Sequence, residues 1–198
     1  MDVTAAINEL HSQGFFIWDD FLSPLEVEKT VQDYLSIYGL NFFKPAGTGN
    51  QSDLTASDGR VRSDETYWLD SLNLTATQSV FWNRLEKLKE EINRQLFLGL
   101  WSLDGHYSRY PRNGFYHRHL DRFNSNDQRT ISMVLYFNEK WISEDGGALR
   151  LHSAPLGIVD VNPIAGRLVC FLSSTMLHEV MVTNQVRLSF AGWWKRRN

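Results

Sequence analysis

From Trp101 to the end of the chain, short apolar runs alternate with turn sequences, and this pattern restricts the fold more than any other feature. The stretches between the runs are rich in Gly, Pro, Asn and Asp. They lie at 111–114, 145–147, 155–157 and 162–166. Several short strands with turn signals at such spacing are typical of a β-sandwich or barrel. We therefore expect a β-rich C-terminal half.

Residues before about 100 have a different texture. Apolar residues recur at helical spacing in 4–12, 24–39 and 77–97, which predicts three helices. Ser23 can cap the second of these helices, and Pro24 suits its first position. A short strand is expected at 14–19, between the first two helices. The Gly-, Ser-, Thr- and Asp-rich segment at 45–60 is predicted to be a mobile loop.

These patterns predict one α+β, β-rich domain over residues 1–198. Its helical support would span about 1–100, and its β core about 101–198, with the helices packed on one sheet. A chain of 198 residues with 42% hydrophobic content is large and apolar enough for one folded core.

Charge and cysteine content narrow the class of partner and the compartment. The net charge of −3 gives no long-range attraction to nucleic acid or anionic membranes, and no apolar segment is long enough to span a bilayer. We expect neither as a partner. The N-terminus has no secretory signal pattern, and the single cysteine, Cys170, lies in an apolar run predicted to be a buried strand. A reducing cytoplasm fits these features, and the sequence does not distinguish a monomer from a homodimer.

Two histidines and one aspartate suggest a metal site. His119 and Asp121 lie two residues apart, so on a strand their side chains would point to the same face. His178 would supply a third ligand if its strand faces the first one across the sandwich. Two imidazoles and one carboxylate hold a non-haem Fe(II) on one face and leave its other positions open. The leading hypothesis is an Fe(II)-dependent oxygenase.

Arg187 adds a second signal because it lies in the apolar run 185–194. A buried arginine is costly unless it meets an anion. Its planar guanidinium can bind a carboxylate through two parallel hydrogen bonds. Arg187 follows His178 on what should be the adjacent strand, and a carboxylate receptor one strand away from an iron site predicts a site for a 2-oxo acid that has a distal carboxylate.

Each of these signals also has a plainer interpretation. A His-x-Asp triplet arises often as a surface pair, and His178 among apolar residues could be a core histidine. His117 lies two residues before His119, a spacing that zinc sites also use, so it is a rival ligand. The other histidines have no partner pattern and are predicted to lie on the surface: His11, His106 and His152.

Several longer motifs follow one another in the C-terminal half. They are Tyr-Pro-Arg-Asn-Gly-Phe-Tyr-His-Arg-His-Leu-Asp at 110–121, then 135–138 with Trp141, 146–150, Pro163, 166–168, Phe171, 178–180 and Arg187. In these motifs the chain resembles the prolyl 4-hydroxylase-type branch of the Fe(II)/2-oxoglutarate dioxygenases. It is most similar to the oxygen-sensing prolyl hydroxylase domain proteins and their bacterial relatives. The resemblance covers about 107–194 and extends more weakly to Arg62-Ser63-Asp64 with Trp68.

The resemblance implies a double-stranded β-helix, or jelly-roll, core and a set of cofactor contacts. His119, Asp121 and His178 would bind Fe(II). The far carboxylate of 2-oxoglutarate would meet Arg187 and the hydroxyl of Tyr136, and Tyr110 would line the same pocket. The oxygen-sensing enzymes carry a hydroxyl four residues after the arginine, where this chain has Ala191. Two consequences stay open: either Ser189 compensates as part of an Arg-x-Ser pair, or the affinity for the co-substrate differs.

The same resemblance implies a substrate side. Tyr116 and Trp193 would lie near the metal and the target residue. Arg62 and Asp64 would lie where these enzymes close over a peptide, together with the loop at 40–60.

The implied activity is prolyl 4-hydroxylation of a protein, such as a translation factor or a ribosomal protein. Oxidative decarboxylation of 2-oxoglutarate to succinate and CO2 would be coupled to hydroxylation of a C–H bond by O2, with ascorbate as an additional reductant. Two alternatives stay open. One is hydroxylation of a free amino acid or small metabolite. The other is a β-sandwich binding module without catalysis.

Overall fold

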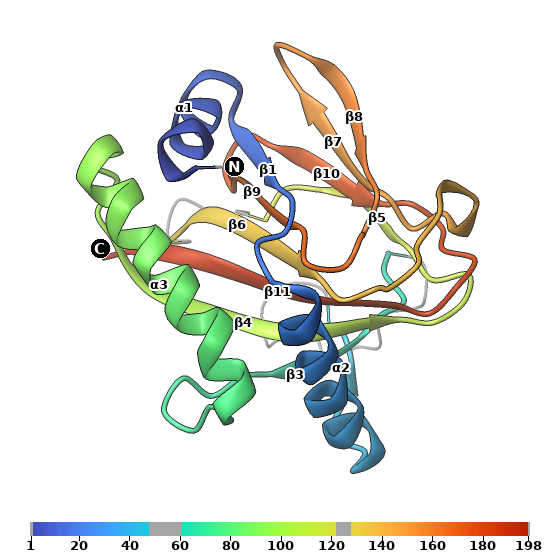
Figure 1. Cartoon of the computed structure of the whole chain (residues 1–198). Coiled ribbons are helices and arrows are strands. Elements are labelled where there is room, and N and C mark those ends of the chain that lie inside the picture. The colour runs from blue at the N-terminus through green and yellow to red at the C-terminus, as the bar shows by residue number, and fades with distance from the viewer. Residues whose placement is uncertain (1, 48–60, 122–127, 198) are drawn as a thin grey trace.

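Two antiparallel sheets face each other in the computed structural model, which describes residues 2–47, 61–121 and 128–197 (Figure 1). The seven-stranded major sheet has the order β1-β9-β6-β11-β4-β3-β2, and the four-stranded minor sheet has the order β5-β10-β7-β8. The major strands are β1 (Phe15–Trp18), β2 (Lys44–Pro45), β3 (Glu65–Trp68), β4 (Leu100–Tyr110), β6 (Arg129–Tyr136), β9 (Leu168–Leu172) and β11 (Arg187–Arg196). The minor strands are β5 (Tyr116–His119), β7 (Leu149–Ser153), β8 (Gly157–Val161) and β10 (Leu177–Val180).

The three predicted helices form and begin at capping residues. They are α1 (Val3–Gln13), α2 (Pro24–Gly39) and α3 (Ala76–Leu96), and a short 3-10 helix, η1 (Ser143–Asp145), follows β6. The Ser23 side chain caps α2 in a reciprocal capping box, as the sequence predicted. Gly14 ends α1 in the left-handed conformation, with φ of 83°, which suits a residue without a side chain.

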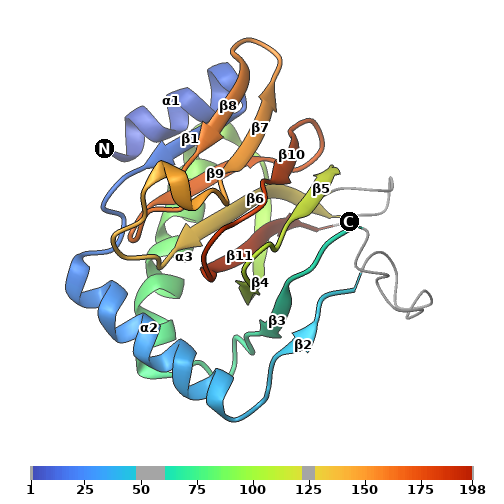
Figure 2. The ribbon, with the colours of Figure 1, turned by 90° about the vertical axis from the view of Figure 1, so that its right-hand side faces the viewer.

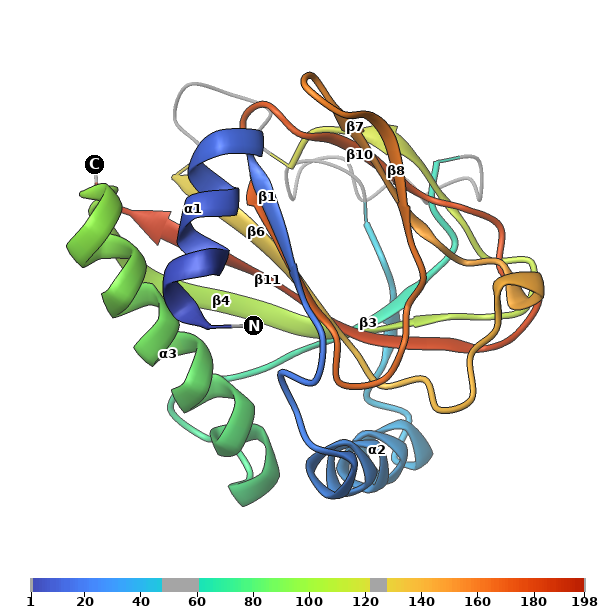
Figure 3. The same ribbon diagram turned by 45° about the horizontal axis from the view of Figure 1, so that its top comes forward.

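The helices cover one face of the major sheet, and the minor sheet covers the other (Figure 3). The larger hydrophobic core lies between the helices and the major sheet. Leu85 and Ile92 of α3 contribute to it, together with Phe190 and Trp194 of β11. A smaller core lies between the sheets, around Leu151 and Phe171. Burial of both faces therefore fixes the major sheet as the central layer.

Strand register brings distant parts of the sequence together. In the major sheet Arg187 of β11 pairs with Tyr110 of β4, and Ser189 lies between Ser108 and Tyr136. In the minor sheet His178 of β10 pairs with His119 of β5. Because alternate residues of a strand share a face, each register places a row of side chains between the sheets.

The jelly-roll expected from the family resemblance is confirmed, with helices on one sheet. Strands β1, β2 and β3 come from the N-terminal part and join the major sheet, with β2 and β3 side by side at one edge (Figure 2). The boundary near residue 100 stays a prediction. Most of the loop predicted at 45–60 lies outside the described residues. Among the described helices, none is both long and apolar enough to cross a bilayer.

Candidate metal centre and co-substrate pocket

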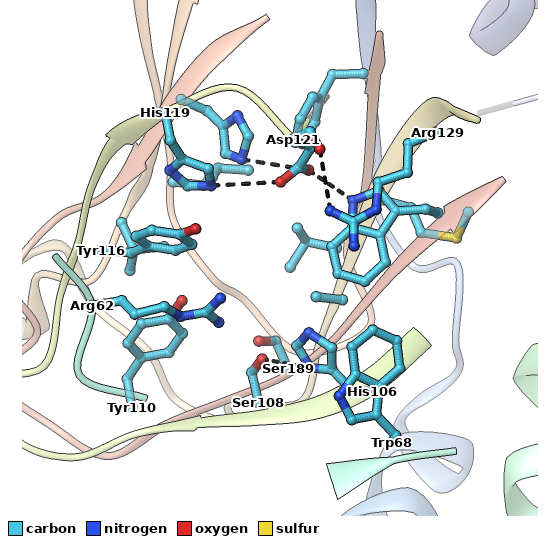
Figure 4. A pocket seen from close by; sticks show the side chains of 18 of the residues that line it. Arg62, Trp68, His106, Ser108, Tyr110, Tyr116, His119, Asp121, Arg129 and Ser189 are labelled. Carbon is cyan, nitrogen blue, oxygen red and sulfur yellow. Dashed lines mark hydrogen bonds and ion pairs between the residues drawn. The ribbon is translucent and has the colours of Figure 1, made fainter. Parts of the chain in front are cut away.

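His119, Asp121 and His178 converge between the two sheets. One ligand atom from each lies within 4.8 Å of the other two. The Asp121 carboxylate oxygens lie 3.6 Å from His119 Nε2 and 3.7 Å from His178 Nε2. Figure 4 shows His119 and Asp121 pointing toward each other at one side of a cavity of about 1020 Å³. The three side chains form one cluster, with open space beside it.

Contacts behind the ligands orient them. His119 Nδ1 lies 2.7 Å from the His117 carbonyl oxygen, and His178 Nδ1 lies 3.0 Å from the Met176 carbonyl oxygen. A carbonyl only accepts, so each Nδ1 carries the hydrogen and each Nε2 has a lone pair for a metal. The Trp193 indole N–H donates to Asp121 Oδ2 at 2.9 Å. These contacts fix both rings and one carboxylate oxygen.

The protonation states also suit a metal. Burial raises the pKa of Asp121, but His178 and His119 outweigh that effect, so this pKa lies well below its ordinary value. Burial lowers the pKa of His178 to about 4 despite the attraction of Asp121. At neutral pH the cluster therefore offers neutral imidazole nitrogen and carboxylate oxygen. This donor set fits a non-haem Fe(II) that keeps open positions.

Arg187 lies at the other end of the cavity and is 1% exposed. Its Nε donates to the Gly147 carbonyl at 2.9 Å, and its Nη1 donates to Ser189 Oγ at 3.3 Å. Among the described residues, no carboxylate pairs with this guanidinium. A buried guanidinium without a counter-charge is costly, so the site fits an anionic ligand.

Two further side chains, those of Tyr136 and Tyr110, complete this anion site. The buried hydroxyl of Tyr136 has no hydrogen-bond partner among the described residues. The guanidinium carbon of Arg187 lies 5.0 Å from the centre of the Tyr136 ring and 5.1 Å from that of Tyr110. Burial raises the pKa of both tyrosines, so both remain neutral donors at physiological pH. An orphan hydroxyl beside an unpaired guanidinium matches the distal carboxylate of 2-oxoglutarate.

The position of Gly147, next to the Arg187 side chain, suits only a residue without a side chain. Its φ is 64°, a region that side chains disfavour. A Cβ at this position would lie 3.2 Å from Arg187 Cδ and 3.0 Å from the Thr183 side chain. The Gly-Gly run seen in the sequence thus lets the backbone carbonyl approach Arg187 closely.

The predicted substrate side forms a stack beside the metal ligands. Arg62 and Asp64 make two parallel hydrogen bonds of 2.7 and 2.6 Å. The Arg62 guanidinium lies 4.3 Å from the Tyr116 ring centre, and Tyr116 stacks on His119 at 3.6 Å between ring centres. The pair Arg62 and Asp64, from the segment that leads into β3, is therefore connected to a metal ligand through one aromatic ring.

Some sequence expectations need correction. β5 and β10 do not face each other across the sandwich, because they are hydrogen-bonded neighbours in one sheet. Asp121 follows the end of β5 rather than lying within it. Arg187 belongs to the opposite sheet from His178. Alternation along each strand was predictable, but the long-range pairing depends on packing.

Other histidines also differ from expectation. His106 is buried and lines the cavity, although a surface position was predicted. His152 is half-buried and bonds Glu179 at 2.9 Å. The rival ligand His117 packs on Phe115 and does not join the described cluster. Alternation backward from Tyr110 along β4 would have indicated Ser108 and His106 as pocket residues.

Arg129 is a pocket residue that sequence reasoning missed. It donates to the Asp121 backbone carbonyl at 3.1 Å and lies over the Trp193 ring at 4.1 Å. Arg129 is the first residue of β6 and precedes the apolar residues that mark this strand in the sequence, so no periodic signal indicated it.

In this jelly-roll a buried His-Asp-His cluster that fits iron and an arginine that fits a carboxylate line one cavity, which is the arrangement of an Fe(II)- and 2-oxoglutarate-dependent oxygenase. Comparisons with known proteins agree. Residues 105–195 match the family model described as the 2OG-Fe(II) oxygenase superfamily. The chain belongs to this superfamily, whose members use Fe(II), 2-oxoglutarate and O2.

Solved structures place the chain within the prolyl hydroxylase type. It is 33% identical to a Pseudomonas putida prolyl-4-hydroxylase, with a TM-score of 0.89 and 100% of both chains covered. It is 25% identical to a Trichoplax adhaerens prolyl hydroxylase in complex with a hypoxia inducible factor peptide, with a TM-score of 0.87, covering 98% of this chain and 88% of that one. A collagen prolyl hydroxylase of Paramecium Bursaria Chlorella virus-1 shares the fold at 16% identity and a TM-score of 0.66, with 94% and 98% covered.

Proposed function

We propose that this chain is a prolyl 4-hydroxylase that acts on a proline within a protein or peptide. The observation that carries the proposal is the full-length similarity to the Pseudomonas putida prolyl-4-hydroxylase. The site supports the same activity, because a cluster of potential metal ligands and a buried guanidinium without a carboxylate partner line one cavity.

In this proposal His119, Asp121 and His178 hold Fe(II). The iron, with O2 and 2-oxoglutarate, supplies the oxidation, which yields succinate, CO2 and a hydroxylated C–H position. Trp193 holds one Asp121 oxygen through its indole N–H, so the carboxylate presents its other oxygen. Conversion of the substrate thus depends on residues from both sheets.

The anion site anchors the co-substrate. Arg187 binds the distal carboxylate of 2-oxoglutarate, Tyr136 donates its free hydroxyl to it, and Ser189 holds the guanidinium from the side. Tyr110 closes the pocket from β4. Ser189 thereby takes over the task of the hydroxyl that Ala191 does not supply.

A peptide substrate fits the substrate side of the pocket. Tyr116, Trp193 and Arg62 line the cavity beside the metal ligands, and the buried Asp64 holds the Arg62 guanidinium in place. The Trichoplax adhaerens relative, which is solved with a peptide, supports this substrate class. A translation factor or ribosomal protein as target, ascorbate as reductant and a cytoplasmic location are further parts of the proposal.

The first test is an anaerobic titration of Fe(II)-loaded protein with 2-oxoglutarate. We expect a saturable visible charge-transfer band in the wild type and no band in Asp121→Ala, because that variant lacks the anionic ligand and does not retain iron. A folded Asp121→Ala protein with stoichiometric iron and the full band would contradict the ligand assignment.

The second test separates peptide from metabolite chemistry. Short capped peptides with one central proline and free L-proline are supplied to the loaded enzyme, and succinate and hydroxylated product are measured. Product from the peptides supports the proposal. Product from the free amino acid alone would replace it with the metabolite hydroxylase.

A further inference from the structure

His106 is a buried pocket residue to which the proposed reaction assigns no task. It lies on β4, where it pairs with Trp68 of β3 on one side and Ala191 of β11 on the other. It is 3% exposed, and its side chain lines the cavity. Figure 4 shows it across the cavity from His119 and Asp121, next to Ser108.

Two tryptophans frame the imidazole. Its ring centre lies 4.8 Å from that of Trp68 and 5.5 Å from that of Trp193. The two indoles stack on each other at 5.9 Å, and Trp68 remains 53% exposed at the cavity rim. Ala191 opposite His106 is small, so it adds little cover over the imidazole. Trp68, Trp193 and His106 therefore form one surface of the cavity, here called the aromatic floor, in which the imidazole of His106 is polar.

The hydrogen bonds of His106 involve only one of its nitrogens. Nδ1 lies 3.3 Å from the Tyr107 carbonyl oxygen and 3.1 Å from Ser108 Oγ. The carbonyl can only accept and the hydroxyl can do either, so Nδ1 carries the hydrogen. Nε2 is then an acceptor, and no described residue donates to it. Within the described part of the chain this nitrogen therefore has no hydrogen-bond partner.

The ring is also held neutral. Burial lowers the pKa of His106 to about 4, and the positive charge of Arg62 contributes in the same direction. The negative charge of Asp64 opposes this shift without reversing it. At physiological pH the ring thus keeps an Nε2 lone pair, which suits an N–H donor and disfavours an anion or carbonyl oxygen.

Building on the proposed function, we propose that His106 is a specificity-determining residue, whose Nε2 accepts a hydrogen bond from a backbone N–H of the peptide next to the target proline. A proline within a chain has no N–H, so the donor belongs to a flanking residue. The aromatic floor would pack against the same stretch of peptide. A ligand without the donor leaves a buried acceptor unpaired, which selects against it.

The test is a thermodynamic cycle that combines substitutions in the protein with N-methylation of the substrate. The best substrate from the pool of short capped proline peptides is resynthesised with single N-methyl groups on successive flanking amides. Wild type, His106→Leu and His106→Gln are compared by kcat and KM. One N-methyl position should raise the wild-type KM about tenfold, and should have no effect in His106→Leu. His106→Gln, which can accept through its amide oxygen, should keep part of the discrimination.

Two controls distinguish recognition from damage. His152→Leu makes the same change at a histidine on the outer face of the minor sheet. This variant should show the same rise in KM on peptide N-methylation as the wild type. The affinity for 2-oxoglutarate is measured for each variant, and His106→Leu should change it less than about twofold.

The outcomes separate this inference from the proposed function. Peptide turnover with the same N-methyl penalty in wild type and His106→Leu overturns the role of His106 alone. Equal loss of peptide and 2-oxoglutarate affinity also overturns it, because His106 would then support the whole site. A wild type that hydroxylates no peptide overturns the proposed function, and the inference falls with it.

Discussion

The two sheets hold the two halves of the site in different ways. His119 and His178 lie on strands of four residues, and β5 is an edge strand of the minor sheet. Arg187, Tyr136 and Tyr110 lie on β11, β6 and β4, which are long neighbours within the major sheet. The carboxylate receptor is therefore part of the structural framework, whereas the metal centre lies near an edge and depends on support from across the cavity.

The largest expected effect is on 2-oxoglutarate affinity, when the positive charge of the anion site is removed. This change tests whether the two halves of the site act separately. Arg187→Ala should weaken 2-oxoglutarate binding by on the order of 100-fold, because the co-substrate carboxylate is left buried and unpaired. Iron binding should change little, since the guanidinium contacts none of the three ligands. Titration of the charge-transfer band and a metal assay measure the two affinities.

The matched control for this change is Arg150→Ala. Arg150 forms a bidentate pair with Asp160 near the edge of the minor sheet, so its loss should affect neither affinity. If Arg187→Ala weakened iron and 2-oxoglutarate equally, the division of labour between the sheets would be wrong.

A smaller effect tests the support that the metal centre receives from the major sheet. Trp193→Phe keeps an aromatic ring but removes the 2.9 Å hydrogen bond to Asp121. Iron affinity should fall by roughly 10-fold, as is usual when a residue that orients a metal ligand is lost. Competition with a chelator measures this change.

Trp68→Phe is the control, because Trp68 stacks on Trp193 without a bond to Asp121. Its iron affinity should match that of the wild type. Equal weakening in both variants would mean that the aromatic packing, and not the indole N–H, supports the centre.

The metal-free protein should also show a pH dependence of stability that comes from the major sheet. The pKa of His106 is about 4 in the folded state against 6.5 for an unperturbed histidine. Between these values the unfolded chain binds a proton that the folded chain does not, so the free energy of unfolding falls as pH falls. His106 contributes up to about 1.4 kcal/mol per pH unit to this slope.

Denaturant unfolding from pH 7 to pH 4 measures that slope. His106→Leu should have a shallower slope, since it removes one of the histidines that protonate only on unfolding. Identical slopes in the two proteins would show that His106 is not held neutral by burial.

The parts of the fold and of the candidate site that the sequence predicted are those that depend on local patterns. The Ser23 cap, the helix periodicity and the turn-separated strands predicted the elements, because each depends on neighbouring residues. The ligand set His119, Asp121 and His178 was also visible, since its chemistry is characteristic. The pairing of β5 with β10 was not, because register depends on packing between distant segments. Burial of His106 was missed for a different reason, because the alternation backward from Tyr110 along β4, which indicates it, was not followed.

Because His119 pairs directly with His178, a metal bound by both would also affect the stability of the fold. The chain has one cysteine and so no intrachain disulfide. An ion held by both histidines would act as a cross-link that closes a long loop of chain and restricts the unfolded ensemble. Iron would then fasten β5 to the sheet as well as serve the reaction. An iron-starved cell would hold a protein that is both inactive and looser at one edge, and therefore more open to proteolysis.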